Sequence, residues 1–370
     1  MHIPDGYLSP QTCAAAYVVA VPTWAVASNR VTRVVKTRNV PTLAILAALS
    51  FLVMMFNIPI PDGTTAHAVG AVIIAIVLGP WAAVIAVSVA LLFQALLFGD
   101  GGVLAYGANV VNMAILMPFL GYGVYRLVAG RSPLTSRRRM VAAAIAGYAG
   151  INAAGFATAV EFGIQPELFH TASGAPLYSP YHLSQTIPAM MLAHLTIAGA
   201  AEAILTGGVF AYLARADARR LAVTHRDIPV AAGDTPKTGD AAAPPARRLT
   251  PARLSLGFVA LMVLLTPLGL LAPGGAFGED APEDLNLGQF GLSSVPAGLA
   301  RYNGFWSHTL LGDYGFHDGR HANLAYILSA VVGIAVVGAA IFAVGTVVTW
   351  VTRRRGAAGP ERGTAEPETA

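Results

Sequence analysis

Apolar residues along this chain gather into nine segments that are separated by shorter polar stretches. The segments cover about residues 9–28, 41–58, 64–79, 81–98, 104–128, 139–162, 184–213, 254–272 and 324–351. Several of them are shorter than the roughly 20 residues that a straight membrane span needs. Only Gly79 and Pro80 separate the third segment from the fourth. The pattern predicts a series of membrane-spanning helices, of which the third and fourth are hardly divided.

Lys and Arg are concentrated in the loops after the first, fifth and seventh segments and in the tail. Residues 58–65 and 163–183 contain neither Lys nor Arg. The charged sets are Arg30, Arg33, Lys36 and Arg38; Arg126, Arg131, Arg137, Arg138 and Arg139; Arg215, Arg219, Arg220 and Arg226; and Arg353, Arg354 and Arg355. Because loops rich in Lys and Arg stay in the cytoplasm, we expect the N-terminus outside the cell membrane and the C-terminus in the cytoplasm. That orientation needs an odd number of spans, which nine satisfies.

The composition supports a membrane location. Hydrophobic residues make up 55% of the 370 residues and charged residues 11%, whereas a soluble domain carries about 25% charged residues. We therefore expect an all-α polytopic membrane protein. The net charge of +4 does not indicate nucleic-acid binding, because the Arg residues are grouped in loops that orient membrane segments. The single cysteine, Cys13, excludes an internal disulfide and a cysteine-cluster metal site.

A change of composition divides the chain into two units. Residues 216–250 form a cytoplasmic linker whose low-complexity part, from 227, is rich in Ala, Pro, Gly and Asp and too poor in apolar residues to fold. Residues 1–215 form a seven-segment unit before it. Residues 251–351 form a two-segment unit with an outer loop at 272–323, and we expect 352–370 to be a disordered cytoplasmic tail.

The chain begins with the three nitrogens of a chelator. The Met1 α-amine, the His2 amide nitrogen and the His2 imidazole can bind one ion and close two small rings, and Pro4 has no N–H with which to extend the series. Three in-plane nitrogens leave one position open on a square-planar ion, which indicates Ni(II) or Cu(II). The alternative is an ordinary start with no metal role. No basic region precedes the first apolar segment, so we expect no cleaved signal peptide and an intact Met1.

His67 is the candidate for the fourth nitrogen. It lies at the outer end of the third segment, at the same predicted depth as Met1 and His2. The turn sequence Ile3-Pro4-Asp5-Gly6 recurs just before it as Ile60-Pro61-Asp62-Gly63. The alternatives are a polar residue near a helix start and a chance recurrence of a turn.

Other polar residues in the apolar segments are candidates for supporting roles. Asp100, Asn109 and Asn112 can hydrogen-bond the ligand imidazoles; a tight turn with interhelical Asn bonds explains the same residues. Glu202 is a carboxylate at bilayer depth, eight residues after His194. Such a group indicates function, and we assign this pair to energy coupling or helix pairing rather than to metal binding. The remaining outer acidic and histidine residues, Glu161, His170, His182, His308, His317 and His321, fit solvated positions better than a site.

The chain lacks the motifs of an enzyme. It has no G-x-x-x-x-G-K-[ST], and its two lysines, Lys36 and Lys237, lie in other contexts. It cannot hydrolyse ATP through a P-loop, and it contains neither H-E-x-x-H nor G-x-S-x-G. A transporter of this kind needs energy from a gradient or from a partner.

These motifs together resemble the CbiM/NikM nickel and cobalt substrate-binding subunits of energy-coupling-factor transporters, over about residues 1–215. A second resemblance, to the CbiN/NikN (PDGLE-type) auxiliary subunit, covers 251–351. The first rests on Met1–Gly6, Ala66-His67-Ala68, Gly99–Gly102, Gly107-Ala108-Asn109, Asn112-Met113, Ala201-Glu202-Ala203 and Thr206-Gly207. The second rests on Thr266–Pro273, Gly275–Glu279 and Asp313-Tyr314-Gly315.

The resemblance implies a seven-helix bundle with two further helices, and a planar set of four nitrogens from Met1, His2 and His67. It implies that Ni²⁺ or Co²⁺ is the substrate, with no resident cofactor. The implied partners are a transmembrane coupling subunit and two cytoplasmic ATPase subunits. Two other functions stay open: a secondary metal transporter that works alone on an ion gradient, and a membrane sensor that signals through the last two segments. Planar geometry favours nickel over cobalt.

Overall fold

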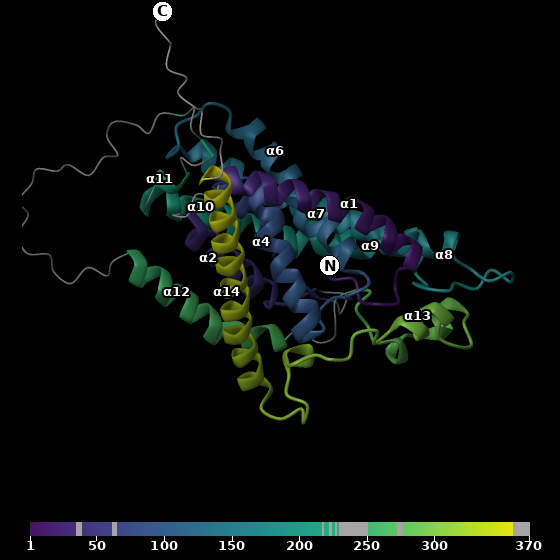
Figure 1. Ribbon diagram of the computed structural model, residues 1–370. Helices are drawn as coiled ribbons and strands as arrows, with labels where there is room; N and C mark the ends of the chain where they lie inside the picture. Colours follow the sequence, from purple (N-terminus) through teal and green to yellow (C-terminus); the bar gives the residue numbers. More distant parts are fainter. Residues whose placement is uncertain are drawn as a thin grey trace, which may run out of the picture.

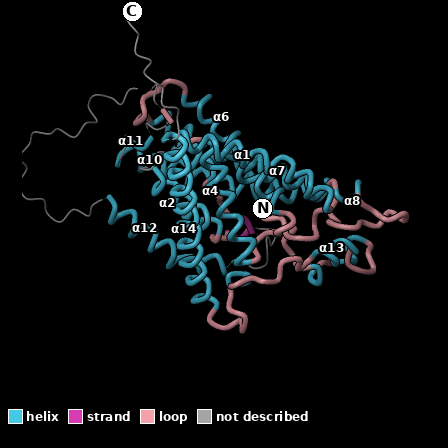
Figure 2. Tube along the Cα trace, in the orientation of Figure 1, coloured by secondary structure: helices cyan, strands magenta, loops and turns pink. Residues whose placement is uncertain are grey.

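The computed structural model describes residues 1–34, 39–60, 65–216, 218–221, 224, 225, 228, 251–271 and 277–357. Helices make up nearly all of the regular structure in these residues (Figure 2). The strands β1 (Ile58–Pro59) and β2 (Thr65–Ala66) form one short antiparallel pair. Together with the apolar helices, this confirms the prediction of an all-α polytopic membrane protein.

Each of the nine apolar segments contains a helix (Figure 1). The first unit contains α1 (Pro10–Val34), α2 (Val40–Met54), α3 (Ala71–Leu78), α4 (Pro80–Phe93), α5 (Tyr106–Asn109), α6 (Met117–Ala129), α7 (Arg137–Gly163), α8 (Gln165–Leu168), α9 (Leu183–Ala193), α10 (Gly199–Ala216) and α11 (Ala218–Leu221). The second contains α12 (Pro251–Leu265), α13 (Ala297–Tyr302) and α14 (Ala322–Ala357). Shorter turns are η2 (Gln94–Phe98), η3 (Val110–Leu116), η4 (His194–Ala198), η5 (Thr266–Leu271), η6 (Pro282–Asp284), η7 (Leu287–Phe290) and η8 (Gly312–Tyr314).

Five helical stretches in the described residues are long and apolar enough to cross a membrane. They are Pro80–Phe98, Tyr106–Ala129, Arg137–Leu168, Leu183–Ala216 and Ala322–Thr346. Val40–Met54 and Gly257–Leu271 are shorter apolar helices. Three of the long stretches contain a π-helical turn, η2, η3 or η4, and such turns are often found at functional sites.

The third apolar segment differs from the predicted span at 64–79. Its helix, α3, has eight residues, all of them buried, and a helix of that length covers only about 12 Å of a hydrocarbon core that is about 30 Å thick. Gly70 begins it with φ +75° and Gly79 ends it with φ +93° before Pro80, conformations that glycine adopts readily. α3 is therefore a half-helix inside the bundle that is too short to span a membrane by itself.

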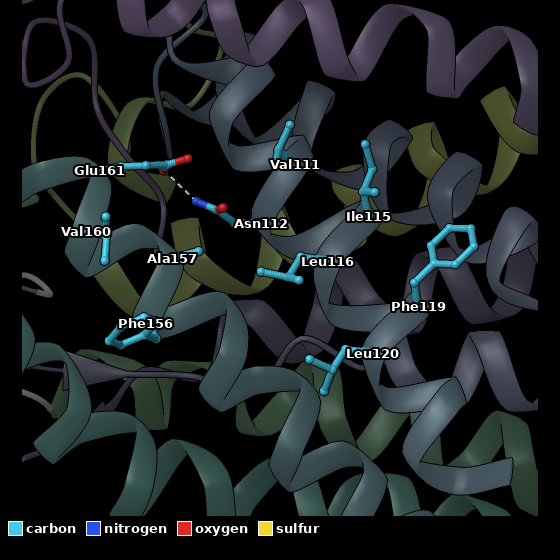
Figure 3. A pocket seen from close by; sticks show the side chains of 10 residues that line it. All are labelled: Val111, Asn112, Ile115, Leu116, Phe119, Leu120, Phe156, Ala157, Val160 and Glu161. Atoms are coloured by element: carbon cyan, nitrogen blue, oxygen red, sulfur yellow. Dashed lines mark hydrogen bonds between the residues drawn. The ribbon is translucent and has the colours of Figure 1, made fainter. Parts of the chain in front are cut away.

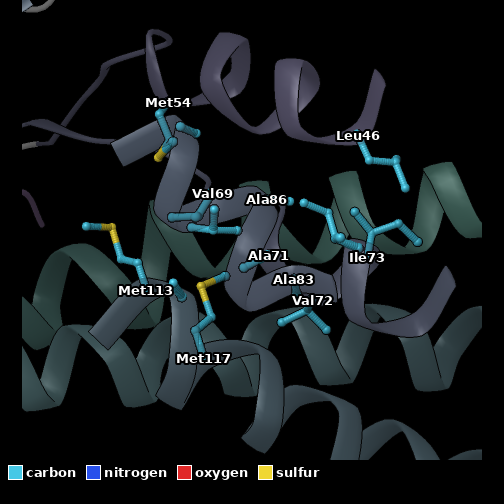
Figure 4. Packing of buried hydrophobic residues seen from close by; sticks show 14 of the residues in the cluster. Leu46, Met54, Val69, Ala71, Val72, Ile73, Ala83, Ala86, Met113 and Met117 are labelled. Atoms are coloured by element: carbon cyan, nitrogen blue, oxygen red, sulfur yellow. The ribbon is translucent and has the colours of Figure 1, made fainter. Parts of the chain in front are cut away.

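The two units pack against each other. α7 lies against α6, α9 and α10 within the first unit, while α14 of the second unit lies along α2 and α4. The main core gathers around α3 and includes Met54, Val69, Val72, Met113 and Met117 (Figure 4). A smaller core joins the N-terminal segment to the outer loop of the second unit, through Ile3, Tyr7, Leu8, Phe162, Tyr181, Leu285 and Leu299.

Parts of the predicted organisation fall outside the described residues. Most of the 216–250 linker lies there, as do Pro61-Asp62-Gly63 of the repeated turn and residues 358–370. α14 runs through Arg353, Arg354 and Arg355 to Ala357, so the predicted tail at 352–370 starts inside a helix. The orientation of the termini across the membrane stays a prediction.

Candidate metal-binding site

The first three residues lie inside the protein, near the centre of Figure 1. Met1, His2 and Ile3 are all buried. The Ile3 N–H donates to Asn109 Oδ1 at 2.8 Å, and the Ile3 carbonyl accepts from Asn109 Nδ2 at 3.1 Å and from the Gly102 N–H at 2.8 Å. Asn109 therefore holds the backbone next to His2, rather than an imidazole as the sequence suggested.

Asp5 fixes the next turn of the N-terminal segment. Its carboxylate accepts from the N–H groups of Val103, Leu104 and Ala105 at 2.8–3.1 Å, at the start of α5. Burial raises the pKa of Asp5, and the three N–H donors oppose that rise. A Cβ on Gly102 would lie 2.0 Å from Asp5 Oδ1, so the glycine is needed for close approach. We did not predict Asp5, although its Pro-Asp-Gly turn was a visible signal.

The imidazoles of His2 and His67 stack on each other. Their ring centroids lie 4.9 Å apart with an interplanar angle of 18°. His67 Nδ1 lies 3.0 Å from the Ala68 carbonyl and His2 Nδ1 lies 2.9 Å from Asp100 Oδ1. The Nε2 atoms of both rings are buried and have no hydrogen-bond partner. An unpartnered buried polar atom costs about 1–3 kcal/mol, and a bound ion is one explanation for it.

The tautomer of His67 leaves it ready to bind a metal. A carbonyl oxygen can only accept, so Nδ1 carries the proton toward Ala68 and Nε2 keeps its lone pair. Burial lowers the pKa of His67, and the nearby positive N-terminus lowers it further. The ring is therefore neutral, as a ligand must be.

Glu279 binds the other two predicted ligand atoms. Its Oε1 accepts from the Met1 α-amine and from the His2 amide, each at 3.1 Å. This residue belongs to the outer loop of the second unit. In the sequence it appeared only as part of a family motif, and nothing local linked it to the N-terminus 278 residues earlier.

Asp100 joins His2 to the second unit as well. Its Oδ2 accepts from the Tyr314 hydroxyl and, at 3.3 Å, from Gln94 Nε2. Burial would raise the pKa of Asp100, but the charge and hydrogen bond of His2 and the bond from Tyr314 hold it well below its usual range. Burial beside Asp100 raises the pKa of Tyr314. Asp100 thus contacts the His2 imidazole, and its predicted support of a metal-bound imidazole stays a prediction.

Chelation requires one rearrangement of this site. A small ring through the His2 side chain uses Nδ1, because Nε2 cannot reach the amide nitrogen of its own residue. Nδ1 faces Asp100 here, so the ring has to turn away from Asp100 to close the predicted chelate. The structure brings Met1, His2, His67, Asp100 and Asn109 together without placing the nitrogens in one plane.

Glu202 supports the loop that carries His67. It is completely buried. Its Oε2 accepts from the N–H groups of Val69 and Gly70 at 2.8 and 2.9 Å, and its Oε1 accepts from Thr206 at 3.0 Å. The carboxylate therefore caps the N-terminus of α3, where a negative charge is favourable. This contact joins α10 to the start of α3; from the sequence we assigned Glu202 to energy coupling or helix pairing.

Two other predicted residues lie in different contacts. Asn112 donates to Thr158 at 3.1 Å and to Glu161 at 2.6 Å, beside an apolar groove between η3–α6 and α7 (Figure 3). It joins two helices and does not reach the imidazoles. His194 hydrogen-bonds the Met190 carbonyl through Nδ1 at 2.6 Å.

Outer histidines do not form a second cluster. His182 is 57% exposed and pairs with Glu167 at 2.9 Å, which agrees with the solvated position expected for it. No group of three or more His, Cys, Asp or Glu side chains in the described residues is arranged to hold a metal ion.

The fold and this geometry define a polytopic membrane protein with a buried N-terminus beside two stacked imidazoles. Residues 2–220 match the family described as CbiM, cobalt uptake substrate-specific transmembrane region. The chain belongs to this family.

Similar proteins include full-length relatives and solved structures. The fused nickel transport protein NikMN of Rhodobacter capsulatus is 48% identical, with 92% of this chain and 96% of the relative covered. The probable fused nickel transport protein LarMN of Lactiplantibacillus plantarum is 44% identical, covering 91% and 95%. A crystal structure of a truncated transition metal transporter is 57% identical with a TM-score of 0.54, covering 58% of this chain and 98% of that one. Resemblance to CbiM/NikM fused to a second unit is thus confirmed.

Proposed function

We propose that this protein is the substrate-capture subunit of an ATP-driven nickel or cobalt importer of the energy-coupling-factor type. The observation that carries the proposal is the buried N-terminus, whose amine, amide and imidazole lie next to the His67 ring. Two fused relatives that match nearly the whole chain are named as nickel transport proteins, which supports metal as the substrate. A planar set of four nitrogens favours Ni²⁺.

The proposed ligands are the Met1 amine, the His2 amide and imidazole nitrogens, and His67 Nε2. The amine and the amide must lose protons to bind the ion, so we expect the affinity to rise with pH. The metal is cargo: it enters from the outside, where we place the N-terminus, and leaves to the cytoplasm.

The energy source in this proposal is a set of partners. A transmembrane coupling subunit and two cytoplasmic ATPase subunits would act on the Arg-rich inner loops. The absence of a phosphate-binding loop from the sequence supports this division of labour. A stand-alone secondary transporter needs charged groups along a central path, and the strongest candidate for one, Glu202, is occupied by backbone N–H groups of the α3 cap.

The experiment is calorimetry of Ni²⁺ binding to the protein with one Gly added before Met1. The extension moves the amine away from the chelate and from Glu279, so high-affinity binding is expected to disappear while the protein stays folded, as read by thermal unfolding. An Ala substitution at exposed His182 is the matched control and should bind like the wild type. Undiminished affinity in the extended protein would contradict the N-terminal chelate.

A further inference from the structure

One carboxylate of the second unit reaches both main-chain nitrogens of the proposed chelate. Glu279 Oε1 lies 3.1 Å from the Met1 amine nitrogen and 3.1 Å from the His2 amide nitrogen. The first unit fixes the chain from Ile3 onward, through Asn109, Gly102 and the Asp5 turn. The backbone nitrogens of the first two residues are therefore held from the other unit.

Contacts on both sides of Glu279 set its position. Gly278 precedes it with φ +78°, and the Phe162 ring lies 2.8 Å from the place where a Cβ on that glycine would be. Asp280 follows it, and its carbonyl accepts from the Tyr7 hydroxyl at 2.7 Å. Because Phe162 and Tyr7 belong to the first unit, the loop presents this carboxylate to the N-terminus in a defined place.

The burial of the charged N-terminus also favours its contact with Glu279. Met1 has only 1% of its side chain exposed, whereas Glu279 has 23%. Leaving a buried ammonium without a partner is expensive, so the carboxylate stabilises the buried N-terminus. The partial exposure of Glu279 gives its carboxylate access to water when it leaves the amine.

We propose that Glu279 is a positioning residue of the metal site. In the metal-free protein its carboxylate holds the Met1 amine and the His2 amide where the ion arrives, and it releases them when the ion binds. To bind the ion the His2 amide loses its single proton and the Met1 amine loses one of three, so the hydrogen bond from the amide ends and the ion pair with the amine is lost. This inference rests on the proposed function, because it assigns those two nitrogens to the metal.

The contact itself can be tested without metal. A carbodiimide joins a carboxylate to an amine only where the two touch, so treatment of the full-length, metal-free protein should link Met1 to Glu279, as read by peptide mass spectrometry. Glu279→Gln should abolish the link. Glu283→Gln, an exposed acidic position on the same loop, should leave it intact. A wild-type protein with no Met1–Glu279 link would overturn the proposal.

Metal binding tests the positioning role. Glu279→Ala should weaken Ni²⁺ binding about tenfold or more in calorimetry, because the ion then has to order the N-terminus itself, at a cost larger than that of displacing the carboxylate. Glu283→Ala should bind like the wild type, and Glu279→Asp should recover part of the loss. Unchanged or tighter binding by Glu279→Ala would show that the carboxylate does not prepare the site and would overturn the proposal.

Two outcomes separate this inference from the proposed function. Ni²⁺ should suppress the Met1–Glu279 link in the wild type, because the ion takes the amine. If the link forms but Ni²⁺ does not suppress it, and the Gly-extended protein binds Ni²⁺ normally, the chelate is wrong and the positioning role fails with it. If the Gly extension abolishes binding while Glu279→Ala does not affect it, only the role of Glu279 is overturned.

Discussion

At the scale of single residues, the two histidines are set up by different neighbours. A carbonyl fixes the proton of His67, while the Asp100 carboxylate, itself bound by Tyr314, faces His2. The Ala68 carbonyl occupies Nδ1 of His67 and leaves Nε2 free, whereas the Asp100 carboxylate occupies the Nδ1 of His2 that the chelate needs. His67 is therefore ready for metal without rearrangement, whereas His2 has to leave Asp100 first.

Removing His67 should weaken Ni²⁺ binding far more than removing His182. We expect His67→Ala to lower the affinity by more than about a hundredfold, because even residues that only support a metal ligand are typically worth roughly 10–100-fold. His182→Ala is the control, since that ring is 57% exposed and paired with Glu167. Calorimetry of Ni²⁺ binding to both variants tests this expectation. Similar losses of affinity would indicate a diffuse outer metal-binding surface.

Gly102→Ala should disrupt the anchor of the N-terminal segment. A Cβ at this position lies 2.0 Å from Asp5 Oδ1, so the carboxylate has to give up some of its N–H partners. We expect a loss of about 1–3 kcal/mol in unfolding free energy and weaker Ni²⁺ binding. Gly123→Ala in α6 has free space around its Cβ and should be neutral or slightly stabilising. A Gly102→Ala protein as stable as the Gly123→Ala control would contradict this account.

Several residues of the candidate site could be predicted from the sequence, and the residues that were missed share one property. Met1, His2 and His67 carry nitrogen donors in an unusual local pattern, so their chemistry is visible in the sequence. Glu279, Tyr314 and Gln94 look like ordinary polar residues until the second unit folds against the first. Asn112 was included because it follows Asn109 by three residues, and His194 because it precedes Glu202 by eight, but spacing along the chain does not determine which neighbour a side chain contacts.

At the scale of elements, the half-helix α3 is the feature that places His67. Apolar content predicted a span at 64–79 and could not show that glycines at both ends confine the helix to eight residues. The other helices followed the pattern closely, because long apolar runs have few alternatives in a membrane. The hydrophobic periodicity of the sequence could not predict the π-helical turns, since one extra residue in a turn hardly changes that periodicity.

Loss of the cap on α3 should affect both stability and metal binding. Glu202→Ala leaves the buried N–H groups of Val69 and Gly70 without an acceptor. We expect it to cost about 2–4 kcal/mol in unfolding free energy and to weaken Ni²⁺ binding by displacing the His67 loop. Thermal unfolding in detergent and calorimetry measure the two effects. The control is Glu167→Ala, whose side chain is 64% exposed; normal Ni²⁺ affinity in Glu202→Ala would refute the positioning of His67 by this cap.

At the scale of the whole molecule, the site is built by both units. α14 packs on α2 and α4, and the loop before it brings Glu279 to the N-terminus and Tyr314 to Asp100. The family model matches residues 2–220, which is essentially the first unit. The second unit therefore adds contacts to a bundle that already supplies the proposed ligands.

Proteoliposomes that contain only this protein should bind Ni²⁺ without concentrating it. The chain carries no phosphate-binding loop and depends, in our proposal, on a coupling subunit and ATPases. Co-reconstitution with those partners and ATP should restore accumulation of radioactive nickel. Accumulation by the protein alone, driven by an imposed proton or sodium gradient, would establish the secondary-transporter alternative instead.

Because one chain carries both units, the Glu279 contact can form with a lower affinity than two separate proteins would need. Groups on one chain meet at an effective concentration that does not depend on the amount of protein and that can reach the millimolar range. A contact with a dissociation constant of about 1 mM, too weak to join separate proteins, would then be formed about half of the time. Such a contact also breaks quickly. In our proposal, a single polypeptide thus supplies one Glu279 carboxylate for each metal site, always in equal number, without the tight binding that would slow the arrival of the ion.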